Sequence, residues 1–110
     1  MTMVNYAQSE HIDRIIAEIS QDLNEEQIQD QNMSQLVNDL YYYAKHPINI
    51  NCATEEQLAA LNVLSDFQIF SLLEHRKKHG NFFSIYEIPA IIGFDVAVAK
   101  KMEPFVTFNS

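Results

Sequence analysis

The sequence is poor in the residues that make turns and cross-links. It has one cysteine, two glycines, three prolines and no tryptophan in 110 residues. A single cysteine excludes an intrachain disulfide, and so little glycine and proline favours helices over a turn-rich β fold. No apolar run approaches the ~20 residues that cross a bilayer, so we expect no membrane insertion of this segment.

The motifs of common enzyme sites are also missing from the sequence. It shows no phosphate-binding glycine loop, no nucleophile elbow and no cluster of metal ligands. Its acidic residues lack the paired arrangement in apolar surroundings that general acid–base catalysis uses. We therefore predict that the protein is not an enzyme and holds no cofactor or metal.

Positive charge is scarce and unevenly distributed. The formal net charge is -8; residues 1–46 hold eight acids against two bases, and residues 47–110 hold seven against five. An acidic chain is a poor partner for nucleic acid in general.

The first eight residues lack a complete secretion signal. Residues 4–8 fit either the tail of a cleaved signal, with Ala7 as the last residue removed, or an ordinary frayed terminus.

The N-terminal half predicts a pair of helices. Residues 10–23 carry an apolar stripe at helical spacing, with Ser9 as the expected N-cap. Residues 24–32 form a polar connection. A second helix follows from Met33 and ends near His46, because Pro47 lacks an N–H and restricts the residue before it.

The second half repeats itself at an offset of thirty residues, which indicates one supersecondary unit used twice. Capping residues fall on capping residues and apolar residues on apolar residues. The pairs are Thr54 with Ser84, Gln57 with Glu87, Leu58 with Ile88, Leu61 with Ile91, Leu64 with Phe94, Ser65 with Asp95, and Leu72 with Met102. Each unit reads as a helix, a turn of about three residues and a second helix.

Four short helices therefore follow residue 50, and their starts are marked by caps. Three capping boxes are present, Thr54-x-x-Gln57, Ser65-x-x-Gln68 and Ser84-x-x-Glu87. Asp95 caps the last helix. Leu64 with Ile69, and Phe83 with Ile88, are expected hydrophobic staples. Gly80 and Pro104 are the expected helix ends, while residues 47–51 and 105–108 are predicted to be extended.

These segments resemble a known family. Residues 48–58, Ile-Asn-Ile-Asn-Cys-Ala-Thr-Glu-Glu-Gln-Leu, are similar to the opening of the helix-hairpin-helix domain of the competence protein ComEA. Residues 61–65 and 91–95 stand at its two hairpins, and residues 75–82 resemble its "R-x-x-x-G-x-F" link. The resemblance covers residues 47–108. It implies a small helical bundle of two helix-hairpin-helix motifs around a pseudo-two-fold axis.

The resemblance also implies sequence-independent DNA binding, in which backbone N–H groups of the hairpins hold phosphate oxygens. The hairpin glycines of the family allow a positive φ and a close approach. Such relatives are often exported to the bacterial cell envelope, so the resemblance favours an exported or periplasmic location over a cytoplasmic one.

The chain departs from this family at the hairpins. Val63 and Ser65 replace both glycines of the first hairpin, and the second keeps Gly93 but has Asp95. We expect the carboxylates of Asp66 and Asp95 to occupy the N–H groups that a phosphate would use. Two like charges about 4 Å apart repel by about 4 kcal/mol at an effective dielectric constant of about 20.

Residual DNA contacts, if any, are predicted at the hairpins and at the only basic cluster. The candidates are Val63, Leu64, Ser65, Asp66, Gly93 and Phe94 at the hairpins, with Lys77, Lys78, Lys100 and Lys101 as charge partners. With Arg76, these cations otherwise read as ordinary charges on a solvated face near helix C-termini.

Other side chains have simpler interpretations. His75 and His79 have the spacing of a helical metal site, but Arg76 excludes a His-Glu-x-x-His protease, so exposed histidines are the default. Cys52 precedes a capping box and reads as structural rather than nucleophilic. In the run at residues 41–43, the first tyrosine belongs to the core stripe, and one of the other two is expected to be exposed, for packing in this chain or on a partner.

Together these observations predict an all-α protein. Residues 1–46 form an acidic helical hairpin and residues 47–110 form a double helix-hairpin-helix domain. The expected function is a non-catalytic interaction or scaffolding module whose partner is another protein or another domain of the same protein. The alternative is weak, sequence-independent DNA binding as in the ComEA-like proteins.

Overall fold

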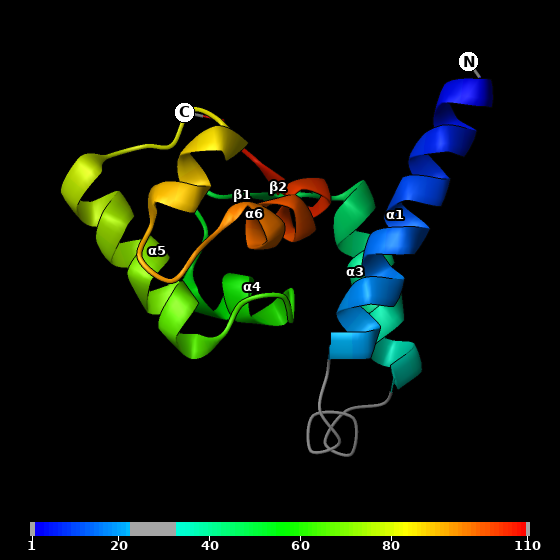
Figure 1. The fold of residues 1–110 in the computed structure, drawn as a ribbon, viewed down its shortest axis with the longest axis horizontal. Helices are drawn as coiled ribbons and strands as arrows, with labels where there is room; N and C mark the ends of the chain where they lie inside the picture. The colour runs from blue at the N-terminus through cyan, green and yellow to red at the C-terminus, as the bar shows by residue number, and fades with distance from the viewer. Residues whose placement is uncertain (1, 23–32, 110) are drawn as a thin grey trace.

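The computed structural model describes residues 2–22 and 33–109, and these residues are mostly helical, as predicted (Figure 1). Helices α1 (Thr2–Asp22) and α3 (Met33–Lys45) pack side by side at one end of the molecule. The predicted connection at residues 24–32 lies outside the described residues. The molecule measures 40 × 37 × 21 Å, so it is about two helices thick.

The repeat region contains two units whose helix starts coincide at the thirty-residue offset. The first unit consists of α4 (Glu55–Ala60) and α5 (Asp66–His79), and the second of the 3-10 helix η1 (Ile85–Ala90) and α6 (Val96–Met102). A short 3-10 helix, η2 (Glu103–Phe105), follows α6 and contains Pro104. The predicted repeat therefore holds for the starts of all four helices.

The predicted caps account for these starts. Thr54, Ser65 and Ser84 each form a capping box, and the carboxylate of Asp95 accepts a hydrogen bond from the N–H of Val98. Each cap satisfies backbone donors that a helix start leaves open. Gly80 ends α5 with φ 85°, as expected for a residue after a helix.

The second unit differs from the first because of Pro89. It lies inside η1 and has no N–H to donate to a residue four positions earlier. The flanking hydrogen bonds are of the i to i−3 kind, from Glu87 N to Ser84 O and from Ile91 N to Ile88 O. One half of the second unit is therefore a 3-10 helix.

Two short strands join the ends of the repeat region. Strand β1 (Ile48–Asn49) pairs in parallel with β2 (Val106–Thr107), with Ile48 opposite Val106. The N–H of Ile50 extends this pairing to the carbonyl of Thr107. Both segments were predicted to be extended, but their pairing was not predicted. It places the first and last parts of the repeat region beside each other (Figure 1).

A single cluster of buried residues runs through the described chain. It joins Ile15, Ile16 and Ile19 of α1 to the core of both repeat units. The apolar residues of the two repeat units are buried at Leu58, Leu61, Leu64, Ile69, Leu72, Ile88, Ile91 and Phe94, and Leu73 is half-buried. The core therefore follows the repeat and continues into the N-terminal helices.

Three expectations for individual residues were wrong. Helix α1 begins at Thr2 rather than after Ser9, since no glycine or proline interrupts the chain before it. Phe83 is 82% exposed, so it forms no staple with the buried Ile88. Tyr41 is 37% exposed and donates a hydrogen bond to Asp13 instead of joining the core. Residues 4–8 lie within α1, and the interpretation of a signal tail stays a prediction.

Candidate functional site

The two interhelical turns are the predicted site, and the structure builds them differently. In the first turn, Asn62 takes φ 57° and donates its N–H to the carbonyl of Ala59. Asparagine is one of the few residue types that adopt this left-handed conformation readily. Because Asn62 takes the positive φ, the backbone at Val63 does not need one, although the resembled family has glycine there.

The second turn keeps the glycine. Phe94 donates its N–H to the carbonyl of Ile91, and Gly93 takes φ 90° at the third position, as a type II turn requires. The positive φ thus falls one repeat position later than in the first turn. Both turns lead into a capped helix start, at Ser65 and Asp95.

The two turns lie against each other. The side chain of Gln68, at the start of α5, donates a hydrogen bond from Nε2 to the carbonyl of Gly93 at 3.1 Å. The ring of Phe67 covers the same glycine, so that a Cβ built there would lie 2.8 Å from Phe67 Cε2. The start of the long helix in one unit therefore holds the turn of the other.

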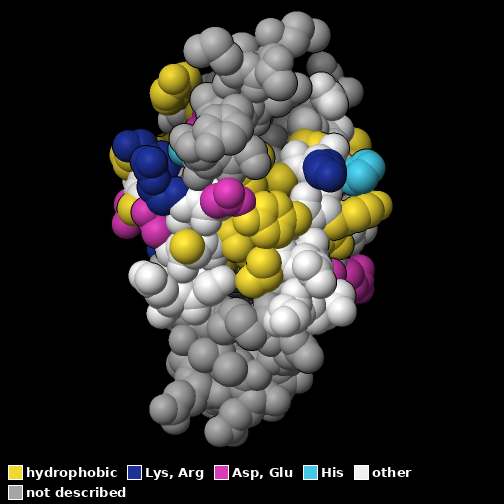
Figure 2. All heavy atoms as spheres, turned by 90° about the vertical axis from the view of Figure 1, so that its right-hand side faces the viewer, with side chains coloured by type: hydrophobic (Ala, Val, Ile, Leu, Met, Phe, Trp, Pro, Cys, Tyr) yellow, Lys and Arg dark blue, Asp and Glu magenta, His cyan; other side chains and the backbone are white. Residues whose placement is uncertain are grey.

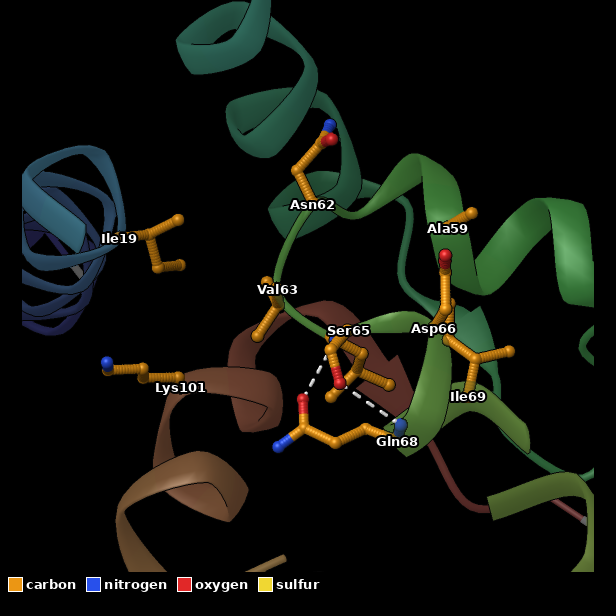
Figure 3. Close-up of a pocket in the computed structure, with 10 residues that line it drawn as sticks. Ile19, Ala59, Asn62, Val63, Ser65, Asp66, Gln68, Ile69 and Lys101 are labelled. Carbon is orange, nitrogen blue, oxygen red and sulfur yellow. Dashed lines mark hydrogen bonds between the residues drawn. The ribbon is translucent and has the colours of Figure 1, made fainter. Parts of the chain in front are cut away.

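Two backbone donors at the start of α5, the N–H groups of Ser65 and Gln68, are already used by the chain itself. Ser65 Oγ accepts the N–H of Gln68 at 3.2 Å, and Gln68 Oε1 accepts the N–H of Ser65 at 2.9 Å (Figure 3). The carboxylate of Asp66 was expected to accept hydrogen bonds from the N–H groups of this helix start. Its side chain is instead exposed, and within the described residues it accepts no hydrogen bond. At the second start, Asp95 does cap, at 2.8 Å from Val98 N.

The predicted DNA-binding residues do not form one surface. Leu64 and Phe94 are buried, Val63 and Lys101 are half-buried, and Ser65, Asp66 and Gly93 are exposed. Lys77 lies eleven residues along α5 from Asp66, about 16 Å from the turn. Lys100 and Lys101 lie on α6. The lysines are therefore spread over two helices rather than gathered at the turns.

A cavity of about 470 Å³ lies between the first turn, helix α1 and helix α6. Figure 3 shows Ile19 of α1 and Lys101 of α6 at its rim, near Val63 and Ser65. It combines one cation with the exposed carboxylate of Asp66 and apolar walls. Lys101 is a predicted charge partner, and it lines this cavity together with Val63 and Ser65 of the first hairpin.

A more apolar groove lies along the other side of α5. It encloses about 430 Å³ and is lined by Phe67 and Phe70 near the turns, by Ile91 and Ile92 of the second turn, and by Lys78 and His79 further along. Phe67 is 56%, Phe70 62% and Ile92 77% exposed. Exposed large apolar side chains that lie together mark interaction surfaces more often than chance.

The sequence reading missed Phe67 and Phe70. They lie off the core stripe that contains Ile69, Leu72 and Leu73, on the side of α5 that would otherwise be polar. Two aromatic residues three positions apart share a helix face. This three-residue spacing of aromatic residues, outside the core stripe, is the feature of the sequence that could have revealed them.

Arg76 makes hydrogen bonds within the chain. Its Nη1 donates hydrogen bonds to the carbonyls of Ile50 and Ala53, both at 2.9 Å. Nearby, Asn51 exchanges hydrogen bonds with the backbone of Phe82 and also donates to the carbonyl of Asn109. These contacts tie the segment before α4 to α5 and to the end of the chain.

His75 and His79 are paired on α5. Their ring centroids lie 4.4 Å apart, and the ring of His75 stacks on the buried Phe82 at 5.5 Å. Burial lowers the pKa of His75, and the nearby His79 lowers it further, while Glu87 acts in the opposite direction. Among the described residues, no three His, Cys, Asp or Glu side chains are grouped to hold a metal ion. Cys52 is exposed and accepts a weak hydrogen bond from Asn49 at 3.5 Å.

The N-terminal helices present a second exposed apolar surface. Figure 2 shows hydrophobic side chains gathered in the middle of the face of α1 and α3, with Lys and Arg side chains to either side. Tyr42 is more exposed than Tyr41 and stacks on His46 at 4.5 Å, while Tyr43 packs partly against the core. The prediction that Tyr42 or Tyr43 would be exposed is met by Tyr42.

Models of known families, curated proteins and solved structures give no match to this chain. In the described part of the chain, no helix is both long enough and apolar enough to span a bilayer. The geometry of the turns and of the α5 groove is therefore the basis for a functional assignment.

Proposed function

We propose that the chain is a non-catalytic module of the helix-hairpin-helix type that binds another protein or another domain. The observation that carries this proposal is the groove beside α5, where Phe67, Phe70 and Ile92 are exposed together. Aromatic side chains on a rigid helix are the usual anchors of protein interfaces. A partner that covers them gains from removing their apolar area from water.

The state of the helix starts supports this proposal over phosphate binding. The cap of α5 is a reciprocal pair between Ser65 and Gln68, and the cap of α6 is the carboxylate of Asp95. A phosphate that used the N–H groups of Ser65, Gln68 or Val98 would have to displace these bonds, and at Asp95 it would approach a like charge. The net charge of -8 adds a long-range repulsion.

Sequence-independent DNA binding is the second candidate. It is favoured by two observations: Gly93 is exposed and has a left-handed φ, and Lys101 lines the cavity beside the other turn. This arrangement preserves part of what an anion-binding hairpin needs.

Fluorescence anisotropy with labelled duplex and single-stranded DNA separates the two functions. The protein is titrated at low and at physiological salt. The interaction module predicts no binding at micromolar protein in either salt. Micromolar binding that weakens steeply with salt, as counterion release requires, would establish DNA binding instead. The charge variants Lys100→Ala and Lys101→Ala would then reduce the salt slope, whereas Lys45→Ala, on α3, would not.

A further inference from the structure

The α5 groove has an apolar end and a cationic end. Phe67 and Phe70 lie on the first turns of α5, and Ile92 faces them from the second interhelical turn. Lys78 and His79 line the groove on the last turn of α5. The two ends are about two to three helical turns apart, or on the order of 12–16 Å.

The basic end of the groove is only partly balanced by the chain. Residues 74–79 hold one acid, Glu74, which also lines the groove, against Arg76, Lys77 and Lys78. Within the described residues, Lys77 and Lys78 form no ion pair, even though Glu74 is four residues before Lys78. Arg76 donates to the carbonyls of Ile50 and Ala53 and does not line the groove, so the excess charge beside the groove comes from Lys77 and Lys78. A local excess of positive charge therefore stands beside an apolar surface in a chain of net charge -8.

We propose that this groove takes a segment of a partner protein that carries large apolar side chains followed by carboxylates, with the carboxylates at the end of the groove that Lys78 lines and Lys77 adjoins. The proposal rests on the interaction function and specifies the chemistry of the partner. The apolar side chains fill the space beside Phe70, and the charges fix the direction in which the segment lies. Complementary charge at the edge of an apolar contact selects orientation and partner more than it adds affinity.

Two designed peptides test this assignment. Both are amphipathic helices with three leucines on one face; one ends in two glutamates and the other in two lysines at the same positions. Each is titrated into the full chain at low salt while the amide spectrum is recorded by NMR. We expect both to shift amides at Phe67, Phe70 and Ile92, with the glutamate peptide binding about fivefold tighter.

Charge reversal provides the specific control. In the double variant Lys77→Glu/Lys78→Glu the preference is expected to invert, so that the lysine peptide binds tighter. Lys100→Glu, an exposed lysine on α6, is the matched control and should leave the preference unchanged. Phe70→Ala, at a side chain that is 62% exposed, should weaken both peptides about tenfold while the helical circular dichroism stays the same.

The outcomes distinguish this inference from the function on which it rests. Equal affinity of the two peptides for the groove would overturn the acidic preference and leave the interaction module standing. Shifts outside the groove, or none with either peptide, would overturn both. Concentration-dependent shifts of the groove amides without peptide would identify a second copy as the occupant, and shifts with single-stranded DNA would identify base stacking on the phenylalanines. Either of these results would also overturn the inference.

Discussion

The ring of Phe67 lies over Gly93, close enough that a Cβ at position 93 would meet Cε2 of the ring at 2.8 Å. The same glycine has φ 90°, and its carbonyl accepts the Gln68 side chain. Two separate constraints therefore hold this position to glycine: a backbone conformation and a contact between the two repeat units.

Substitution of this glycine should be costly. We expect Gly93→Ala to lower the free energy of unfolding by about 2–3 kcal/mol, since backbone strain and the contact with Phe67 act together. Gly80→Ala is the matched control, because Gly80 has φ 85° but no atom within 4 Å of an added Cβ. It should cost only about 1 kcal/mol. Urea unfolding followed by circular dichroism measures both.

The double variant Phe67→Ala/Gly93→Ala tests the contact itself. Removing the ring should recover part of the loss, so the two substitutions should be non-additive by about 1 kcal/mol. Equal losses in Gly93→Ala and Gly80→Ala, or full additivity in the double variant, would mean that the ring does not constrain the turn.

The helix starts were predictable because they depend on local chemistry. A capping residue and its partner three positions later lie within one turn, so Thr54, Ser65, Ser84 and Asp95 marked four boundaries correctly. Ser9 shows the limit of this reasoning: a residue that is able to cap does so only where the helix begins, and α1 begins at Thr2.

Contacts between distant segments were not predictable in the same way. Two-residue strands such as β1 and β2 show no alternation that would reveal their pairing. The role of Arg76 depends on the carbonyls of Ile50 and Ala53, more than twenty residues earlier, so its charge alone suggested a solvated cation. The groove was missed because it forms only where the second turn meets α5, at Ile92.

Arg76 should stabilise the fold through its hydrogen bonds rather than through its charge. Arg76→Ala removes both hydrogen bonds to carbonyls and should lower the free energy of unfolding by about 2–3 kcal/mol, with little dependence on salt. Lys77→Ala, the neighbouring exposed residue, should change it by less than about 0.5 kcal/mol. Thermal and urea unfolding at two salt concentrations provide the comparison. Similar small effects in both variants would show that the Arg76 bonds do not hold the segment before α4.

The two acidic residues at the helix starts should behave differently. Asp95 caps α6 through Val98 N, so Asp95→Ala should cost about 1 kcal/mol of stability. Asp66 accepts no hydrogen bond within the described residues, and Asp66→Ala should stay within about 0.5 kcal/mol of the parent chain. Asp95→Asn retains an oxygen acceptor and serves as the conservative control. A larger loss in Asp66→Ala than in Asp95→Ala would reverse the assignment of the cap.

Stability should fall at mildly acidic pH because of His75. Its pKa is lowered in the folded chain by burial against Phe82 and by His79, although Glu87 opposes the shift. The unfolded chain therefore binds more protons than the folded one between the two pKa values. The stability that His75 contributes is fully present above its unfolded pKa of about 6.5 and is lost as pH falls through the lowered folded pKa.

The slope of stability against pH is the measurement that isolates this effect. Urea unfolding between about pH 5 and pH 8 should show the decline in the parent chain and a flatter profile in His75→Gln. His11→Gln, at an exposed histidine of α1, should keep the parent slope. The slope is compared rather than the absolute stability, because His75→Gln also removes the stacking contact with Phe82. A parent profile that stays level down to pH 5, or equal slopes in both variants, would show that burial does not lower the pKa of His75 in the folded chain.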